Sequence, residues 1–291
     1  MRLTWQRGSF LGGMLTAAEL KPLLQAHQLR LTKKLGQNYL INKPAISRIV
    51  SACALNKSEA VVEIGAGLGA LTESLAQEAK QVTAVEIDRG IFPLLAVQAQ
   101  QWPGVIVKCQ DIFTLPDEWL KEAVVVGAIP YHITSPILVW LSERRQMVRR
   151  AVFIVQKEVA ERLVALPGKK SYGRLSLLAQ YGWETTLLFT VPRSAFFPQP
   201  VVDSACVRFM PRPKALLAPD REGVFFALVK AAFSQRRKQL VNNLQTIEGI
   251  GPVSRKRIEQ LLRQSGHLLT ARGEELSLDQ FLALTNAFCE S

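Results

Sequence analysis

The sequence predicts an α/β protein in which a doubly wound, mostly parallel sheet is followed by a small all-helical domain. Three observations support this fold class: short apolar runs alternate with helical segments over residues 60–156, one such run leads into a glycine loop, and prolines end the alternation. Strands that alternate with helices of this length are typical of βαβ units. A chain of 291 residues can hold one large domain and one small one.

The strands are predicted first, because short runs rich in β-branched residues are typical of buried parallel strands. Five such runs come in order: Ala60–Ile64, Gln81–Glu86, Val105–Cys109, Ala123–Ala128 and Ala151–Val155. Between them, Gly69–Ala79 and Arg89–Gln101 have the length and periodicity of crossover helices. Two later runs, Glu184–Val191 and Ala205–Met210, are expected to complete the sheet.

The helical domain is predicted to begin after Pro211, where Pro213 and Pro219 also interrupt the pattern. Ser277 and Gln280 have the spacing of a capping box at the start of the last helix. Three helices are expected: Glu222–Asn243, Ser254–Ser265 and Ser277–Cys289. We therefore divide the chain into an N-terminal extension (1–30), a cofactor-binding domain (31–211) and a helical domain (212–291).

The net charge of +12 is unevenly distributed along the chain. Residues 1–57 carry nine Lys/Arg and one acidic residue, whereas residues 58–211 carry fifteen of each. Residues 212–291 carry twelve basic and eight acidic residues. Basic flanks around a neutral middle favour binding to a polyanion such as RNA, with a generally solubilising surface as the alternative.

Several protein classes are excluded by composition and pattern. No run of about 18 apolar residues occurs, as a membrane span would require, and the longest apolar stretch covers only residues 123–130. The N-terminus lacks the features of a secretory signal. The four cysteines and three histidines are scattered without metal-ligand spacing. We expect a cytoplasmic monomer with no metal site and no membrane contact. Its four cysteines are expected to be free thiols: Cys53, Cys109, Cys206 and Cys289.

The glycine loop follows the first predicted strand as Gly65-Ala66-Gly67-Leu68-Gly69 and opens a helix. Glycines at such a turn let the backbone approach a ligand closely. Dinucleotide sites use a related loop, but this one lacks the wider Gly-x-Gly-x-x-Gly spacing. Glu63, two residues before the first glycine, is typical of S-adenosylmethionine sites. The loop therefore favours S-adenosylmethionine over a nicotinamide cofactor.

Acidic residues end the next two strands. Glu86 closes the second strand, where a carboxylate can accept the ribose hydroxyls of either cofactor. Asp111 follows the third strand, where it would accept a hydrogen bond from the amine of the cofactor's adenine. One such acid alone would be expected to cap a helix or face solvent. Two at successive strand ends beside a glycine loop favour a ligand site, because ligands of open α/β sheets bind there.

The fourth strand is followed by Ala128-Ile129-Pro130-Tyr131. Loops of the type [Asn/Asp/Ser]-x-Pro-[Tyr/Phe] supply a side-chain oxygen, a main-chain carbonyl and an aromatic platform. Such a loop accepts the N–H groups of an adenine amine and stacks the base, which frees the nitrogen lone pair to attack a methyl group. A base within a duplex would first have to be flipped out. This part of the sequence points to methylation of an amino group.

With these motifs, the sequence resembles the small-subunit ribosomal RNA adenine dimethyltransferases, the KsgA or RsmA family, over about residues 30–291. Any one motif could arise by chance, whereas the ordered series is specific. Besides the motifs above, the series comprises Lys34-Leu35-Gly36-Gln37-Asn38-Tyr39-Leu40, Val85–Asp88, Gln110-Asp111, Gln156–Val159, Tyr172–Ser176, Phe196-x-Pro-x-Pro, Asp203-Ser204-Ala205, Ala232–Lys238 and Arg272-x-Glu274-x-Leu276-Ser277.

The resemblance implies a class I methyltransferase domain with a Rossmann-like sheet and a helical RNA-binding domain. It implies that Tyr131 and Phe196 hold the target adenine, Phe196 being otherwise a core aromatic. The substrate would be two adjacent adenosines in a hairpin near the 3′ end of 16S RNA, on the immature small subunit, and each would receive two methyl groups. S-adenosylmethionine would contact Asn38, Leu40, Gly65, Gly67, Glu86, Asp111 and Ala128.

One position departs from the family pattern: Ala128 stands where the family has Asn, and His132 where a second Asn is common. Alanine cannot accept the adenine N–H, whereas the Ile129 carbonyl and the Tyr131 ring remain. Loss of one preorganised contact of this kind can cost about 10²–10³ in rate. The enzyme would be slow, with water or His132 partly replacing the amide, or would act as an assembly factor with little turnover; an artificial substitution is a third explanation.

Two further hypotheses remain open. A large-subunit RNA methyltransferase of the macrolide-resistance type shares the fold and motifs, although the Phe-x-Pro-x-Pro segment and a basic helix containing Gln235–Lys238 favour the small-subunit branch. Two arginines and a lysine in that helix would contact RNA phosphates, or would form a solvated face. A nicotinamide-dependent enzyme is the more distant alternative.

Overall fold

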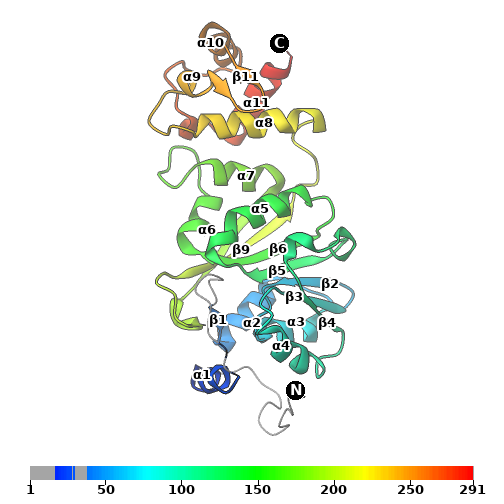
Figure 1. Cartoon of the computed structure of the whole chain (residues 1–291). Coiled ribbons are helices and arrows are strands. Elements are labelled where there is room, and N and C mark those ends of the chain that lie inside the picture. Colours follow the sequence, from blue (N-terminus) through cyan, green and yellow to red (C-terminus); the bar gives the residue numbers. More distant parts are fainter. Residues whose placement is uncertain (1–16, 28, 30–37, 291) are drawn as a thin grey trace. The chain divides into compact units, whose positions relative to one another are not determined.

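A computed structural model of the chain describes residues 17–27, 29 and 38–290. These residues form two compact units that interleave along the sequence (Figure 1). The first unit holds the residues up to Trp140 together with Gln146–Lys157 and Leu188–Phe209. The second holds Leu141–Arg145, Glu158–Leu187 and the residues from Met210 onward. The division into functional domains at residue 211 stays a prediction.

A seven-stranded sheet has the strand order β4-β3-β2-β5-β6-β9-β7. Neighbouring strands from β4 to β6 run parallel, and β9 runs antiparallel to β6. This mostly parallel sheet with crossover helices confirms the predicted α/β fold class. The strands are β2 (Ala60–Ile64), β3 (Gln81–Glu86), β4 (Val105–Cys109), β5 (Val124–Ala128), β6 (Arg150–Gln156), β7 (Trp183–Val191) and β9 (Ser204–Pro211).

The register brings the carboxyl ends of the parallel strands to one edge of the sheet. Ile64 at the end of β2 pairs with Val85 on β3 and with Gly127 on β5. The loops after these strands therefore converge, which is where open α/β sheets bind ligands. The intervening helices are α3 (Ala70–Glu78), α4 (Phe92–Ala99) and α5 (Thr134–Glu143).

Several short elements were not predicted. Strand β1 (Tyr39–Leu40) pairs antiparallel with β8 (Phe196–Phe197), which joins segments far apart in the sequence. Two-residue strands carry no periodic signal, so only tertiary structure defines them. The unpredicted helices are α2 (Lys43–Ala52), α6 (Lys157–Leu163) and α7 (Arg174–Gly182), and helix α1 (Ala17–Ala26) lies in the predicted N-terminal extension.

The helix predicted over 222–243 is wrong in its second half. Helix α8 ends at Ala232, residues 233–239 form turns, and a four-residue helix α9 follows. The amide of Asn243 donates to the carbonyls of Ala232 (2.8 Å) and Gln235 (3.1 Å), so side-chain bonds replace the helical ones. The remaining elements are α8 (Pro219–Ala232), α9 (Leu240–Asn243), β10 (Thr246–Ile247), β11 (Gly251–Pro252), α10 (Arg255–Gln264) and α11 (Leu278–Cys289).

Residues Gln235–Lys238 therefore lie in a turn and not on a helix face. The Arg236 guanidinium donates to Glu274 (2.6 Å) and to the Tyr172 carbonyl (3.2 Å), within the second unit. Arg236 thus bonds within its own unit, and Arg236, Arg237 and Lys238 are all exposed. Among the described helices, none is long and apolar enough to cross a membrane.

A buried ion pair joins the start of β6 to the segment between α2 and β2. Arg150, the first residue of β6, makes two charge-assisted hydrogen bonds to Glu59, of 2.8 and 2.7 Å. Its guanidinium also donates to the carbonyls of Cys53 (2.6 Å) and Ala54 (2.8 Å), the latter in a left-handed conformation with φ of 47°. Arg150 therefore ties the chain after α2 to the start of the sheet.

Arg150→Met is expected to lower the free energy of unfolding by about 3–5 kcal/mol, because the buried Glu59 carboxylate then keeps only Arg149, 3.6 Å away, as a cationic partner. Arg149→Met is the matched control. Arg149 is 45% exposed; it lies 2.8 Å from Glu122 and 3.6 Å from Glu59, which keeps its closer bonds to Arg150, so the loss of Arg149 should cost less than about 1 kcal/mol. Urea unfolding followed by circular dichroism measures both values, and equal losses would contradict the role given to Arg150.

Candidate cofactor and acceptor pocket

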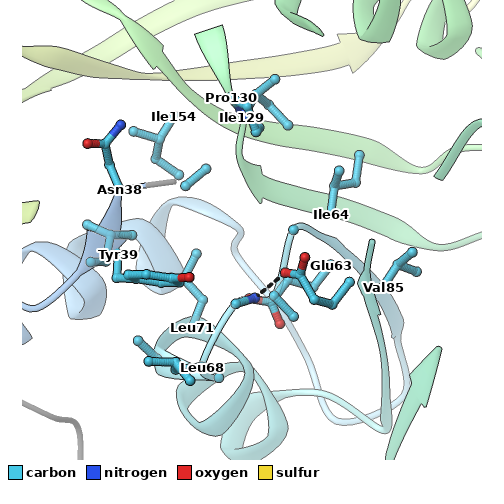
Figure 2. Close-up of a pocket in the computed structure, with 18 of the residues that line it drawn as sticks. Asn38, Tyr39, Glu63, Ile64, Leu68, Leu71, Val85, Ile129, Pro130 and Ile154 are labelled. Atoms are coloured by element: carbon cyan, nitrogen blue, oxygen red, sulfur yellow. Dashed lines mark hydrogen bonds between the residues drawn. The ribbon is translucent and has the colours of Figure 1, made fainter. Parts of the chain in front are cut away.

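A pocket opens where the loops after β2, β3, β4 and β5 converge, and β1 and β8 close one side of it. In Figure 2, Tyr39 lies on one side of the pocket, Val85 on the opposite side, and Pro130 above them. Every site residue named from the sequence lines this pocket: Asn38, Leu40, Gly65, Gly67, Glu86, Asp111, Ala128, Ile129, Pro130, Tyr131 and Phe196.

The glycine loop exposes backbone to the pocket. Gly65, Gly67 and Gly69 all have positive φ, of 69°, 58° and 84°. A Cβ added at Gly65 would meet no atom within 4 Å, so the missing side chain leaves open space beside the main chain. A Cβ at Gly69 would lie 2.4 Å from the ring of Trp102, so this glycine is required for packing. The loop is therefore a cradle that a side chain at Gly65 would fill.

Glu86 holds the glycine loop against the end of β3. One carboxylate oxygen accepts the Gly67 amide (2.7 Å) and the other accepts the Asp88 amide (2.8 Å). Burial raises the pKa of Glu86, and the two backbone hydrogen bonds oppose that shift. The carboxylate lines the pocket with its orientation fixed from both sides.

Glu63 has a structural partner. Its carboxyl is 1% exposed and accepts a hydrogen bond of 2.5 Å from the Thr72 hydroxyl, which ties β2 to α3. Burial raises the pKa of Glu63 to about 8, the Thr72 bond opposes the shift, and the nearby Glu86 adds to it. The Glu63 carboxyl is therefore protonated in the folded protein at neutral pH.

Stability should fall as pH rises from about 5 toward 8, because the folded state keeps a proton on Glu63 that the unfolded state loses. Glu63→Gln keeps an acceptor for Thr72 and removes this titration. We expect the wild-type Tm to fall by about 3 °C or more over this range relative to Glu63→Gln. Thermal scans at pH 5.5 and 8 check this, with the exposed Glu78→Gln as control; parallel pH dependence in all three proteins would refute it.

Asp111 follows β4, with one oxygen capping a short 3₁₀ helix over Ile112–Thr114 by accepting the Phe113 amide (3.0 Å). Its second oxygen makes no hydrogen bond to the described residues. Two apolar side chains near it were missed from the sequence: Ile87 is 50% exposed and Phe113 is 36% exposed, and both line the pocket. An apolar residue directly after a strand-end acid was the available signal for Ile87.

The acceptor loop leaves β5 at Ala128, which is half-buried. The Ile129 amide donates to the Ile154 carbonyl on β6 (2.9 Å), whereas no described residue donates to the Ile129 carbonyl. The Tyr131 hydroxyl lies 3.3 Å from the Ser204 hydroxyl. His132 is exposed and also lines the pocket. The loop therefore offers a free carbonyl and an anchored aromatic ring, but no side-chain oxygen at residue 128.

Phe196 has two surroundings at once. It lines the pocket, yet it is only 5% exposed and packs in a core cluster with Leu40, Val126 and Ile154. Pairing of Phe196 with Leu40 between β8 and β1 sets its position. The ring therefore belongs to the core and forms part of the pocket wall. Of the motif at 34–40, residues Lys34–Gln37 lie outside the described residues.

Comparisons with known proteins match the chain over nearly its full length. The family model "Ribosomal RNA adenine dimethylase" matches residues 28–282. Proteins named ribosomal RNA small subunit methyltransferase A from Bacillus mycoides (strain KBAB4) and Bacillus cereus (strain AH187) are each 39% identical over 280 residues, covering 94% of this chain and 96% of theirs.

Solved structures agree with this match. A dimethyladenosine transferase from Plasmodium falciparum has a TM-score of 0.75 and 27% identity, covering 86% of this chain and 97% of its own. The 23S rRNA methyltransferase ErmE has a TM-score of 0.67 and 29% identity, covering 86% and 99%. The likeness confirms the predicted class I methyltransferase fold and the resemblance drawn from the motifs. The chain belongs to the ribosomal RNA adenine dimethylase family of methyltransferases.

Proposed function

We propose that the pocket binds S-adenosylmethionine and that the protein dimethylates the N6 amino groups of two adjacent adenosines in a hairpin near the 3′ end of 16S rRNA, on the immature small subunit. The observation that carries the proposal is the convergence of every motif-derived site residue on one pocket at the carboxyl edge of the sheet. The names of the 39% identical relatives support the small subunit as substrate.

The residues of the pocket fit the proposed cofactor. Gly65 leaves open backbone beside the pocket, and an anchored carboxylate at Glu86 can accept ribose hydroxyls. Exposed apolar side chains at Ile87 and Phe113 offer apolar contacts for the faces of a purine. The second carboxylate oxygen of Asp111 would accept a hydrogen bond from the amine of that purine. When bound, the cofactor supplies an electrophilic methyl group on a sulfonium.

Asp111→Asn tests this assignment, because asparagine still caps the 3₁₀ helix and replaces the second acceptor oxygen with a donor. We expect S-adenosylhomocysteine to bind about 10-fold more weakly by calorimetry. Asp88→Asn is the control, since Asp88 caps a turn outside the pocket through Gly90 (2.7 Å). S-inosylhomocysteine carries a carbonyl in place of the amine, so it should bind Asp111→Asn at least as tightly as Asp88→Asn, because the asparagine amide can donate to that carbonyl. Unchanged affinity of Asp111→Asn for S-adenosylhomocysteine would refute the role.

The acceptor side works through orientation. An adenine N6 is a weak nucleophile, since its lone pair is delocalised into the ring. No described residue donates a hydrogen bond to the Ile129 carbonyl, so this carbonyl would accept one N–H of the adenine amine. The Tyr131 ring would stack on the base. Phe196 would bound the base from the opposite wall. Because Ala128 contributes no second acceptor, catalysis would depend on this carbonyl and on the position of the ring.

Radiolabelled methyl transfer to undermethylated small subunits tests the activity. We expect incorporation of label into the RNA by the wild type, and we expect Ala128→Asn to raise turnover about 100-fold by restoring one preorganised acceptor. The control is Ser58→Asn, which adds an amide at an exposed residue that does not line the pocket. No label above background from the wild type would overturn the activity.

A second candidate follows from the same residue. The protein would bind the small subunit and the cofactor with negligible turnover, as an assembly factor, because Ala128 lacks the acceptor oxygen. Tight subunit binding without incorporation of label, followed by activity in Ala128→Asn, would favour this candidate. The likeness to the 23S rRNA methyltransferase ErmE makes the large-subunit RNA the comparison substrate in both assays.

A further inference from the structure

Tyr131 is anchored at both of its ends. Its carbonyl accepts a hydrogen bond from the Thr134 hydroxyl (3.2 Å), and Thr134 is 3% exposed. At the other end, its phenol lies 3.3 Å from the hydroxyl of Ser204. No other described residue hydrogen-bonds the phenol. The tilt of the ring therefore depends on Thr134 through the backbone and on Ser204 through the side chain.

Ser204 reaches Tyr131 across a neighbouring strand. Ser204 begins β9 and pairs with Gln156 at the end of β6, while β6 pairs with β5, which leads into the acceptor loop. Strand β6 lies between β5 and β9 in the sheet, and the Tyr131 phenol contacts the first residue of β9. Ser204 is 1% exposed and, like Tyr131, lines the pocket.

Ser204 is itself held rigidly. The carbonyl of the preceding residue, Asp203, accepts the Lys157 amide (3.0 Å), and its carboxylate accepts the Arg193 amide (2.9 Å). Arg193 also donates to the Val201 carbonyl (3.3 Å), which closes the loop before β9. Because its backbone is fixed by these bonds and by the sheet, the Ser204 hydroxyl is a stationary point for the phenol.

We propose that Ser204 is a positioning residue for the target base: its hydroxyl sets the tilt of the Tyr131 ring on which the base stacks. The inference rests on the proposed function. Ala128 leaves the acceptor loop without a side-chain oxygen, so the ring and the Ile129 carbonyl are the groups of this loop that remain to orient the amine. A ring free to tilt would hold the base in more orientations and reach the reactive one less often.

Steady-state methyl transfer tests the proposal with four variants. Ser204→Ala should lower kcat about 3–10-fold, with the KM for S-adenosylmethionine unchanged, because one neutral hydrogen bond is lost. Tyr131→Phe should lower kcat by a similar factor, and the double variant should fall no further than either single one. Ser204→Thr, which keeps a hydroxyl, should recover most of the rate.

The matched control is Tyr172→Phe. It removes a tyrosine hydroxyl that donates to the Leu276 carbonyl (2.7 Å) in the second compact unit, so it should change stability without changing kcat. Wild-type kcat in Ser204→Ala, or additive losses in the double variant, would overturn the proposal.

An equilibrium measurement separates this inference from the proposed activity. With 2-aminopurine in place of the target adenine of the RNA hairpin, stacking on Tyr131 should quench its fluorescence at saturating protein. We expect weaker quenching in Ser204→Ala than in the wild type, even if the wild type transfers no methyl group. Equal quenching in both proteins, or none in the wild type, would contradict the role of Ser204.

Discussion

The hydrogen bond from the Gly67 amide to the Glu86 carboxylate is the contact on which the pocket depends. It joins the loop after β2 to the end of β3, and so converts two separate strand ends into one wall. The second oxygen of Glu86 holds the Asp88 amide, which fixes the chain as it turns toward α4. With the parallel register of β2, β3 and β5, this tie sets where the glycine backbone lies open and where the acceptor loop begins.

Much of the fold could be predicted because its signals are local. Strands β2, β3 and β4 have the predicted bounds, and the other four sheet strands differ by one residue at one or both ends. The helix predicted over 222–243 failed because the break depends on Asn243, whose amide bonds to Ala232 only once the chain has folded back. Strands β1 and β8 were not predicted for the same reason, because each is defined only by its pairing with the other.

The site shows a similar division. Glycines, strand-end acids and the Ile-Pro-Tyr loop carry recognisable spacing, and the structure brings them to one pocket; their individual roles stay predictions. Ile87 and Phe113 could not be distinguished from core residues before their exposure was known. Glu63 has the spacing of a cofactor residue, yet its carboxyl is bonded to Thr72 and buried. Spacing alone could not separate a ligand contact from a bond between β2 and α3.

Because Ala128 has no acceptor oxygen, orientation of the target amine depends on few groups of the acceptor loop. Without an acceptor side chain, the loop retains the Ile129 carbonyl and a Tyr131 ring held by Thr134 and Ser204. The central claim is that these groups suffice to methylate adenosine. Mass spectrometry of small-subunit RNA after incubation with the wild-type protein and S-adenosylmethionine tests it most directly. The account predicts N6,N6-dimethyladenosine at two adjacent positions; unmodified adenosine at both would contradict it.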